Sequence, residues 1–89
     1  MRAVVTVIGK DMVGILAQVS AVCAQSNANI MDVTQSVMQD LFTMVMLVEI
    51  DKLTLEDTEF ALKVGTIGDE MGLSVHVMHE DIFNAMHRI

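Results

Sequence analysis

The spacing of apolar residues predicts a strand followed by a helix in the first third of the chain. Residues 3–8 are rich in β-branched side chains and end at Gly9, which indicates a short buried strand. The apolar positions that follow recur every three or four residues and predict a helix over about residues 13–26. Its buried stripe would consist of Met12, Ile15, Leu16, Val19, Val22 and Cys23. Asn27, Ala28 and Asn29 then predict a turn, because Asn tolerates left-handed backbone angles.

The next two segments alternate with the period of β-strands. Residues 30–38 and 41–50 show this alternation, and residues 39–40 have the right length for a tight hairpin between them. In the strand over residues 30–38 we expect Asp32, Thr34 and Ser36 on one face and Met31, Val33, Gln35 and Val37 on the other. In the second we expect Phe42, Met44, Met46, Val48 and Ile50 opposite Thr43, Val45, Leu47 and Glu49. Both faces of this second strand therefore carry apolar side chains.

A second helix is expected to begin at Thr54, whose hydroxyl would cap it while Asp57 reaches back. Its apolar stripe is Phe60, Val64, Ile67 and Met71, and Gly72 would end it. Gly65 and Gly68 weaken this helix by roughly 1 kcal/mol each relative to Ala. They indicate either a tolerated loss or a break near Gly65 on the one hand, or close packing against a neighbouring element on the other.

The last segments predict a strand and a short helix. Residues 73–78 alternate between apolar and polar positions, as a fourth strand would. From Glu80 the chain predicts a short amphipathic helix whose apolar stripe is Ile82, Phe83, Met86 and Ile89.

This order of elements predicts an α+β protein with a ferredoxin-like βαββαβ sandwich and a short C-terminal helix, forming a single domain over residues 1–89. Two helices would cover one face of a four-stranded antiparallel sheet. The other face would carry Val4, Thr6, Ile8, Thr43, Val45 and Leu47 if the core takes Val5 and Phe42. Because this face or edge of the sheet is so apolar, we expect a second subunit to cover it.

Composition narrows the function classes. The 89 residues are 53% hydrophobic and 3% aromatic, and 5 Lys and Arg against 12 Asp and Glu give a net charge of −7. Scattered cations and few aromatics argue against nucleic-acid binding, and no apolar run approaches the ~20 residues of a membrane span. The apolar share favours a homodimer or higher homo-oligomer. Cys23 is alone, which excludes an intrachain disulfide and favours the reducing cytoplasm.

The most distinctive segment is the glycine-bounded loop between the first strand and the first helix. Free backbone N–H groups at a helix start suit a carboxylate or phosphate ligand, and Gly14 would allow close approach to the backbone. The spacing matches neither a Walker loop nor a dinucleotide fingerprint. The alternative is that Asp11 caps the helix and Gly14 only eases the packing of helix on strand.

The pattern Gly9-x-Asp11-x-x-Gly14-Ile15-Leu16-Ala17, followed by Asn29-Ile30 and Asp32-Val33-Thr34-Gln35, resembles the ACT domain, a small regulatory amino-acid-binding module. The Phe42-Thr43-Met44 strand and the tail over residues 82–89 are similar to a family of small stand-alone bacterial ACT-domain proteins. The resemblance covers essentially the whole chain.

The resemblance implies a ligand site between subunits, with no catalytic activity and no cofactor. One half would be the loop of one subunit, namely Lys10, Asp11, Met12, Val13, Gly14 and Ile15. The other half would be the start of the second strand of a paired subunit, namely Asn29, Ile30 and Asp32, with Asp32 facing an α-amino group. We expect no attached catalytic or DNA-binding domain, in which case any regulated enzyme or regulator would be a separate protein. The competing hypothesis is an interaction module that docks on such a partner without a small ligand.

Other reactive side chains do not form a recognisable centre. His76, His79 and His87 lie near Glu80 and Asp81, but their spacing is poor for one metal ion, so no metal site is expected. Cys23 falls on a buried stripe and is interpreted as a small core residue rather than a nucleophile. The nine methionines are interpreted as adaptable core or interface side chains.

Overall fold

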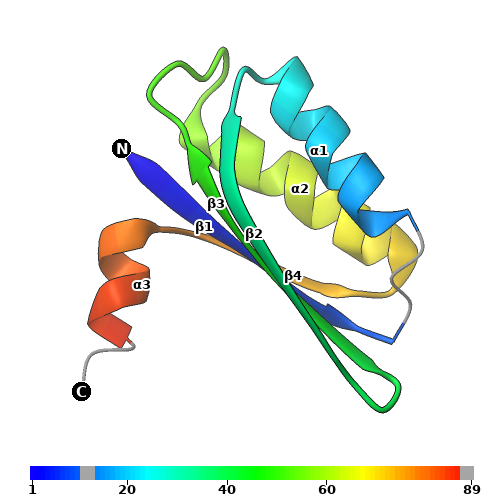
Figure 1. Cartoon of the computed structure of the whole chain (residues 1–89). Coiled ribbons are helices and arrows are strands. Elements are labelled where there is room, and N and C mark those ends of the chain that lie inside the picture. Colours follow the sequence, from blue (N-terminus) through cyan, green and yellow to red (C-terminus); the bar gives the residue numbers. More distant parts are fainter. Residues whose placement is uncertain (11–13, 87–89) are drawn as a thin grey trace.

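The chain folds as a two-layer sandwich in the computed structural model, which describes residues 1–10 and 14–86. One antiparallel sheet has the order β2-β3-β1-β4; α1 and α2 cover one face, and α3 lies on the other side of the sheet (Figure 1). The elements are β1 (Arg2–Gly9), α1 (Ile15–Gln25), β2 (Asn29–Met38), β3 (Leu41–Glu49), α2 (Asp57–Met71), β4 (Ser74–His79) and α3 (Glu80–Met86). The predicted ferredoxin-like sandwich with a C-terminal helix is confirmed. No helix of the described residues is long and apolar enough to cross a membrane.

The core lies between the sheet and the two helices. The central strands supply Val5, Val7, Met44 and Met46, which are all fully buried, and each such side chain contributes about 1.5–3 kcal/mol. The helices complete it with buried residues at helical spacing: Ile15, Val19 and Cys23 on α1, and Phe60, Val64 and Ile67 on α2. The alternation predicted for β3 is confirmed, with Phe42, Met44, Met46 and Val48 turned to the core.

Helix α1 begins at Ile15, slightly later than the residue 13 that periodicity predicts. Gly14 holds the N-cap position with a left-handed backbone (φ 79°) and no side-chain capping bond. A residue with a Cβ pays about 1–2 kcal/mol for that conformation, which explains the glycine. The alternative cap, Asp11, lies outside the described residues.

The predicted start of the second helix at Thr54 is wrong. Helix α2 begins at Asp57, with Glu56 as its N-cap and no side-chain capping bond. The Thr54 backbone N–H instead donates to the Ser26 carbonyl (3.0 Å) at the end of α1. Leu53 and Leu55 on either side pack against the core. This tethered segment is held in a non-helical path, so the local capping pattern is overruled by contacts distant in sequence.

Strand β2 also departs from strict alternation. A β-bulge between Ile30 and Asp32 places an extra residue, Met31, in the strand. Ile30 and Val33 consequently both pack on the core, whereas Met31 is 47% exposed. The expectation that Met31 and Val33 share a face is therefore wrong, because simple period-2 counting cannot see an inserted residue.

The face of the sheet away from α1 and α2 carries the apolar residues that the sequence predicted. Val4, on β1, pairs with Leu47 on one side and Met78 on the other, so an apolar row crosses three strands. The next row towards the hairpin, Val45, Thr6 and His76, is more polar. Helix α3 contacts β1 and β4, and its stripe residues Ile82 and Met86 remain 53% and 66% exposed. Ile89, the predicted end of that stripe, lies outside the described residues.

The two glycines inside α2 have different environments. A Cβ built on Gly68 would lie 2.4 Å from Val75 Cγ2 and 3.2 Å from the Leu73 carbonyl, whereas one built on Gly65 would meet nothing within 4 Å. Of the two interpretations, close packing therefore holds at Gly68. Helix α2 is unbroken at Gly65, where the lost helical propensity is tolerated.

We expect Gly68→Ala to lower the free energy of unfolding by about 1–3 kcal/mol, because α2 must move away from β4 to admit the methyl group. Gly65→Ala should instead raise it by up to about 1 kcal/mol, since the alanine fits and favours the helix. Urea denaturation followed by circular dichroism measures both. Equal effects of the two substitutions would contradict the packing at Gly68.

Candidate functional site

The first half of the predicted site is the loop that leads into α1. Lys10 is exposed, and Gly14 is exposed with its left-handed backbone. Ile15 is 1% exposed and belongs to the core, so it can offer a ligand only its backbone. Asp11, Met12 and Val13 lie outside the described residues.

The second half is the start of β2. Asn29 and Asp32 are both exposed, whereas Ile30 is half-buried and packs on the core. The bulge sets Asp32 opposite Leu47, on the sheet face that α1 and α2 leave uncovered. Asn29 and Asp32 therefore present an amide and a carboxylate for binding, while Ile30 mainly anchors the strand.

The two halves lie at opposite ends of the sheet. Gly9, which precedes the loop, pairs with Phe42 near the start of β3, whereas Asn29 pairs with Glu49 at its end. With about 3.3 Å per residue, that part of β3 separates them by about 23 Å. One amino acid cannot touch both halves within a single chain. The predicted site exists only where a second subunit supplies the missing half.

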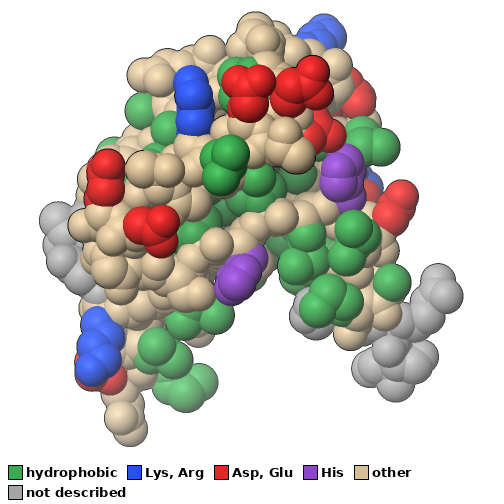
Figure 2. Space-filling view, turned by 180° about the vertical axis from the view of Figure 1, so that it is seen from behind, with side chains coloured by type: hydrophobic (Ala, Val, Ile, Leu, Met, Phe, Trp, Pro, Cys, Tyr) green, Lys and Arg blue, Asp and Glu red, His purple; other side chains and the backbone are tan. Residues whose placement is uncertain are grey.

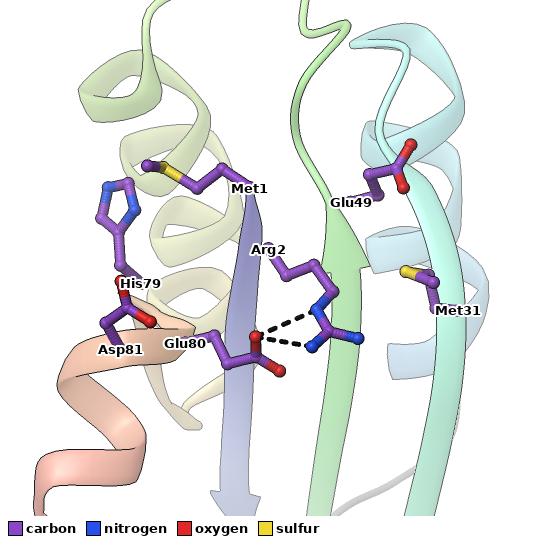
Figure 3. A pocket seen from close by; sticks show the side chains of 7 residues that line it. All are labelled: Met1, Arg2, Met31, Glu49, His79, Glu80 and Asp81. Carbon is purple, nitrogen blue, oxygen red and sulfur yellow. Dashed lines mark hydrogen bonds and ion pairs between the residues drawn. The ribbon is translucent and has the colours of Figure 1, made fainter.

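A hollow of about 410 Å³ lies beside the start of β2 (Figure 3). It is bounded by the beginning of β1, the end of β3, the bulge of β2 and the junction of β4 with α3. Its lining residues are Met1, Arg2, Met31, Glu49, His79, Glu80 and Asp81. Asn29 pairs with Glu49 across β2 and β3, and Glu49 pairs with Arg2 across β3 and β1. These three residues therefore form one row across the sheet.

Charged groups dominate this hollow. Arg2 Nη2 and Nε lie 2.8 Å and 3.0 Å from the same oxygen, Glu80 Oε1 on α3, as Figure 3 shows. The pair is partly exposed, so water screens it and it contributes at most about 1 kcal/mol. Glu49 and Asp81 add two further carboxylates. The hollow thus has three carboxylates against the Arg2 guanidinium, and the Met1 α-ammonium at its border is paired with Asp51, so the remaining negative charge favours a ligand with a cationic group.

Sequence reasoning missed this hollow. Arg2, Glu49 and Glu80 are distant in sequence, and only the register of three strands and the fold of α3 over the sheet bring them together. A signal was present, since Arg2 directly precedes the strand predicted over residues 3–8 and Glu49 lies near the end of the strand predicted over residues 41–50.

The histidines are placed apart. His79 Nε2 lies 3.5 Å from Asp57 Oδ2 at the start of α2, and His76 Nε2 lies 3.2 Å from Ser74 Oγ on the same strand. Within residues 1–10 and 14–86, no group of three or more His, Cys, Asp or Glu side chains could hold a metal ion. His87 lies outside the described residues.

Cys23 lies in the core at 1% exposure, as its place on the apolar stripe of α1 predicts. Burial raises the pKa of its thiol, because the thiolate would be poorly solvated there. Both effects suppress nucleophilic reactivity.

We therefore expect the native protein to resist alkylation of Cys23 at mildly alkaline pH. Labelling with iodoacetamide, followed by intact-mass spectrometry, should become fast only in denaturant. Rapid labelling of the folded protein would contradict the buried position of the thiol.

Comparison with known proteins places these features in a family. A family model described as "ACT domain" matches residues 2–78. A UPF0237 protein of Methanococcus maripaludis is 48% identical over 88 residues, covering 99% of this chain and 98% of the relative. A UPF0237 protein of Listeria innocua is 47% identical over 89 residues, covering 100% of both. The relatives are thus archaeal as well as bacterial, which is broader than the bacterial resemblance predicted.

The fold has a close match among solved structures. The structure described as an ACT domain protein from Streptococcus pneumoniae superimposes with a TM-score of 0.79 at 33% identity, covering 98% of each chain. The similarity extends over the helical layer and the whole sheet.

Proposed function

Because the chain belongs to the ACT-domain family, whose members are commonly regulatory modules that bind small ligands, we propose that it is a non-catalytic regulatory module that binds an α-amino acid between two copies of itself. One copy supplies the loop of residues 10–15, and its partner supplies the start of β2.

The separation of the two halves is the observation that carries this proposal. A two-fold axis that sets two sheets antiparallel brings the end of β1 in one copy towards the start of β2 in the other, and forms two equal sites. The half-buried Leu47 and Met78 and the exposed stripe of α3 supply surface that such an assembly would bury, whereas Val4 between them is already buried within one copy.

The chemistry of each half suits one end of a zwitterion. The loop leads into α1, whose first backbone N–H groups and dipole favour a carboxylate. The exposed Asp32 and Asn29, with the carboxylate-rich hollow beside them, favour an ammonium group. A ligand that carries both charges would bind across the two halves.

The second candidate function is protein docking without a small ligand. The uncovered sheet face favours it, because Val45 and Leu47 are only half-buried there and Ile8 is 38% exposed. The two candidates differ in whether an amino acid changes the stability of the protein.

A thermal-shift screen of the 20 amino acids tests the ligand. A ligand at 100 times its dissociation constant should stabilise the protein by about 2.7 kcal/mol and raise Tm. If no amino acid raises Tm, docking is the better proposal.

Gly14→Asp should abolish that shift by placing a side chain and a negative charge beside the ligand carboxylate. Gly72→Asp is the matched control, because Gly72 also has a left-handed backbone (φ 71°) and open space around a built Cβ. Both substitutions cost about 1–2 kcal/mol of strain and add one charge. Retained binding by Gly14→Asp, measured by calorimetry, would remove the loop from the site.

Mixing two inactive variants tests whether the site is shared. Asp32→Ala and Gly14→Asp damage different halves, so a mixed dimer regains one intact site, and about one quarter of the wild-type sites should return after subunit exchange. Asp32→Ala mixed with Asn29→Ala should regain none, because both changes lie on β2. Calorimetric titration counts the sites. Failure of the first mixture to recover binding would contradict a site built from two copies.

A further inference from the structure

The outer edge of β4 is free. The sheet order β2-β3-β1-β4 leaves this strand paired only with β1, and no further backbone hydrogen bond reaches its outer edge from the described residues. A free edge presents alternating N–H and C=O groups that an extended segment can pair with.

An apolar groove runs along this edge beneath α2. Two adjoining hollows of about 180 and 570 Å³ share Thr58, Ala61 and Val77. Val75 and Val77 form the floor, and the exposed flank of α2 forms the wall. Figure 2 shows hydrophobic side chains gathered in this hollow, with acidic side chains nearby.

The wall is shaped by a small residue beside a large one. Leu62 is 70% exposed, and Gly65 on the next turn of α2 leaves open space where a side chain would stand. Helix α2 approaches β4 closely at Gly68, whereas a Cβ built on Gly65 meets nothing within 4 Å, so the groove has room beside Gly65. The opening accepts side chains from a strand laid along β4.

The groove is lined by acidic side chains without Lys or Arg among the described residues. Asp57 lines one hollow and Asp69 the other, and neither hollow has a Lys or Arg among its described lining residues. At 1.5 Å per residue along α2 the two aspartates lie about 18 Å apart. The 6 residues of β4 span nearly the same length, about 17 Å.

The geometry points to a docking site in which an extended segment of a partner protein, about six residues long, adds as a fifth strand to β4. Its side chains facing α2 are apolar, and a Lys or Arg at each end meets Asp57 and Asp69. This site is distinct from the loop and the start of β2 and does not depend on ligand binding there.

A second copy of this chain fits the groove less well. Antiparallel pairing of two β4 strands would place Asp57 of each copy beside Asp69 of the other, and the described lining contains no Lys or Arg to offset them. The net charge of −7 adds to this repulsion and attracts a basic partner.

A blocked, fluorescein-labelled peptide with three threonines alternating with two valines between terminal arginines is the probe, because this order puts the valines and both arginines on the strand face turned to α2. We expect the full-length protein to bind it with a Kd below about 1 mM and to raise its fluorescence anisotropy. Glutamates in place of the arginines, or N-methylation along the pairing edge of the peptide, should each weaken binding about tenfold or more. Equal binding of all three peptides, or none, would overturn the proposal.

Variants at one position separate groove filling from misfolding. Gly65→Phe should fill the groove and weaken peptide binding about tenfold or more, whereas Gly65→Ala should keep the wild-type Kd and a folded circular dichroism spectrum. Asp69→Asn should weaken binding and reduce its salt dependence. Wild-type affinity of a folded Gly65→Phe variant would overturn the proposal. So would sedimentation showing that Gly65→Phe dissociates a self-associated wild-type protein, because a second copy would then occupy the groove.

Discussion

The antiparallel register of β1 with β3 is the constraint on which most of this structure depends. It brings Val5 beside Met46 in the core, and it aligns Val4 with Leu47 on the uncovered face. The same register fixes the distance between the loop after β1 and the start of β2. A slip by one residue would turn the apolar side chains of one strand to the face opposite those of its partner. Core, uncovered face and candidate site are thus three results of one pairing.

Periodicity was sufficient to predict the fold because the buried positions of β3 and both helices follow their ideal spacing. It was insufficient where contacts between residues distant in sequence decide the conformation of the backbone. The segment before α2 follows the tie between Thr54 and Ser26, and the bulge at Met31 breaks the alternation of β2. For the site, the loop and Asn29 stand out as a motif, but their separation appears only once strands are paired. The hollow at Arg2 depends on register and on α3, which local patterns do not specify.

Helix α2 shows how two glycines on one helix can serve different ends. Gly68 allows the helix backbone to approach Val75 closely, and Gly65, less than one turn earlier, leaves surface open beside the edge strand. The helix thus packs closely on the sheet near its C-terminal end and leaves open space in its middle. Sequence alone shows two equal losses of helical propensity, and only the packing distinguishes them.

In the proposed shared site, the placement of the loop and the start of β2 at opposite ends of the sheet couples ligand binding to self-association. A ligand that must bridge two copies stabilises their association, and by linkage their association raises the affinity for the ligand. Occupancy of such a site follows the product of two concentrations, that of the small molecule and that of the chain itself. The response threshold in a cell would then be set by expression level as much as by contacts in the binding site.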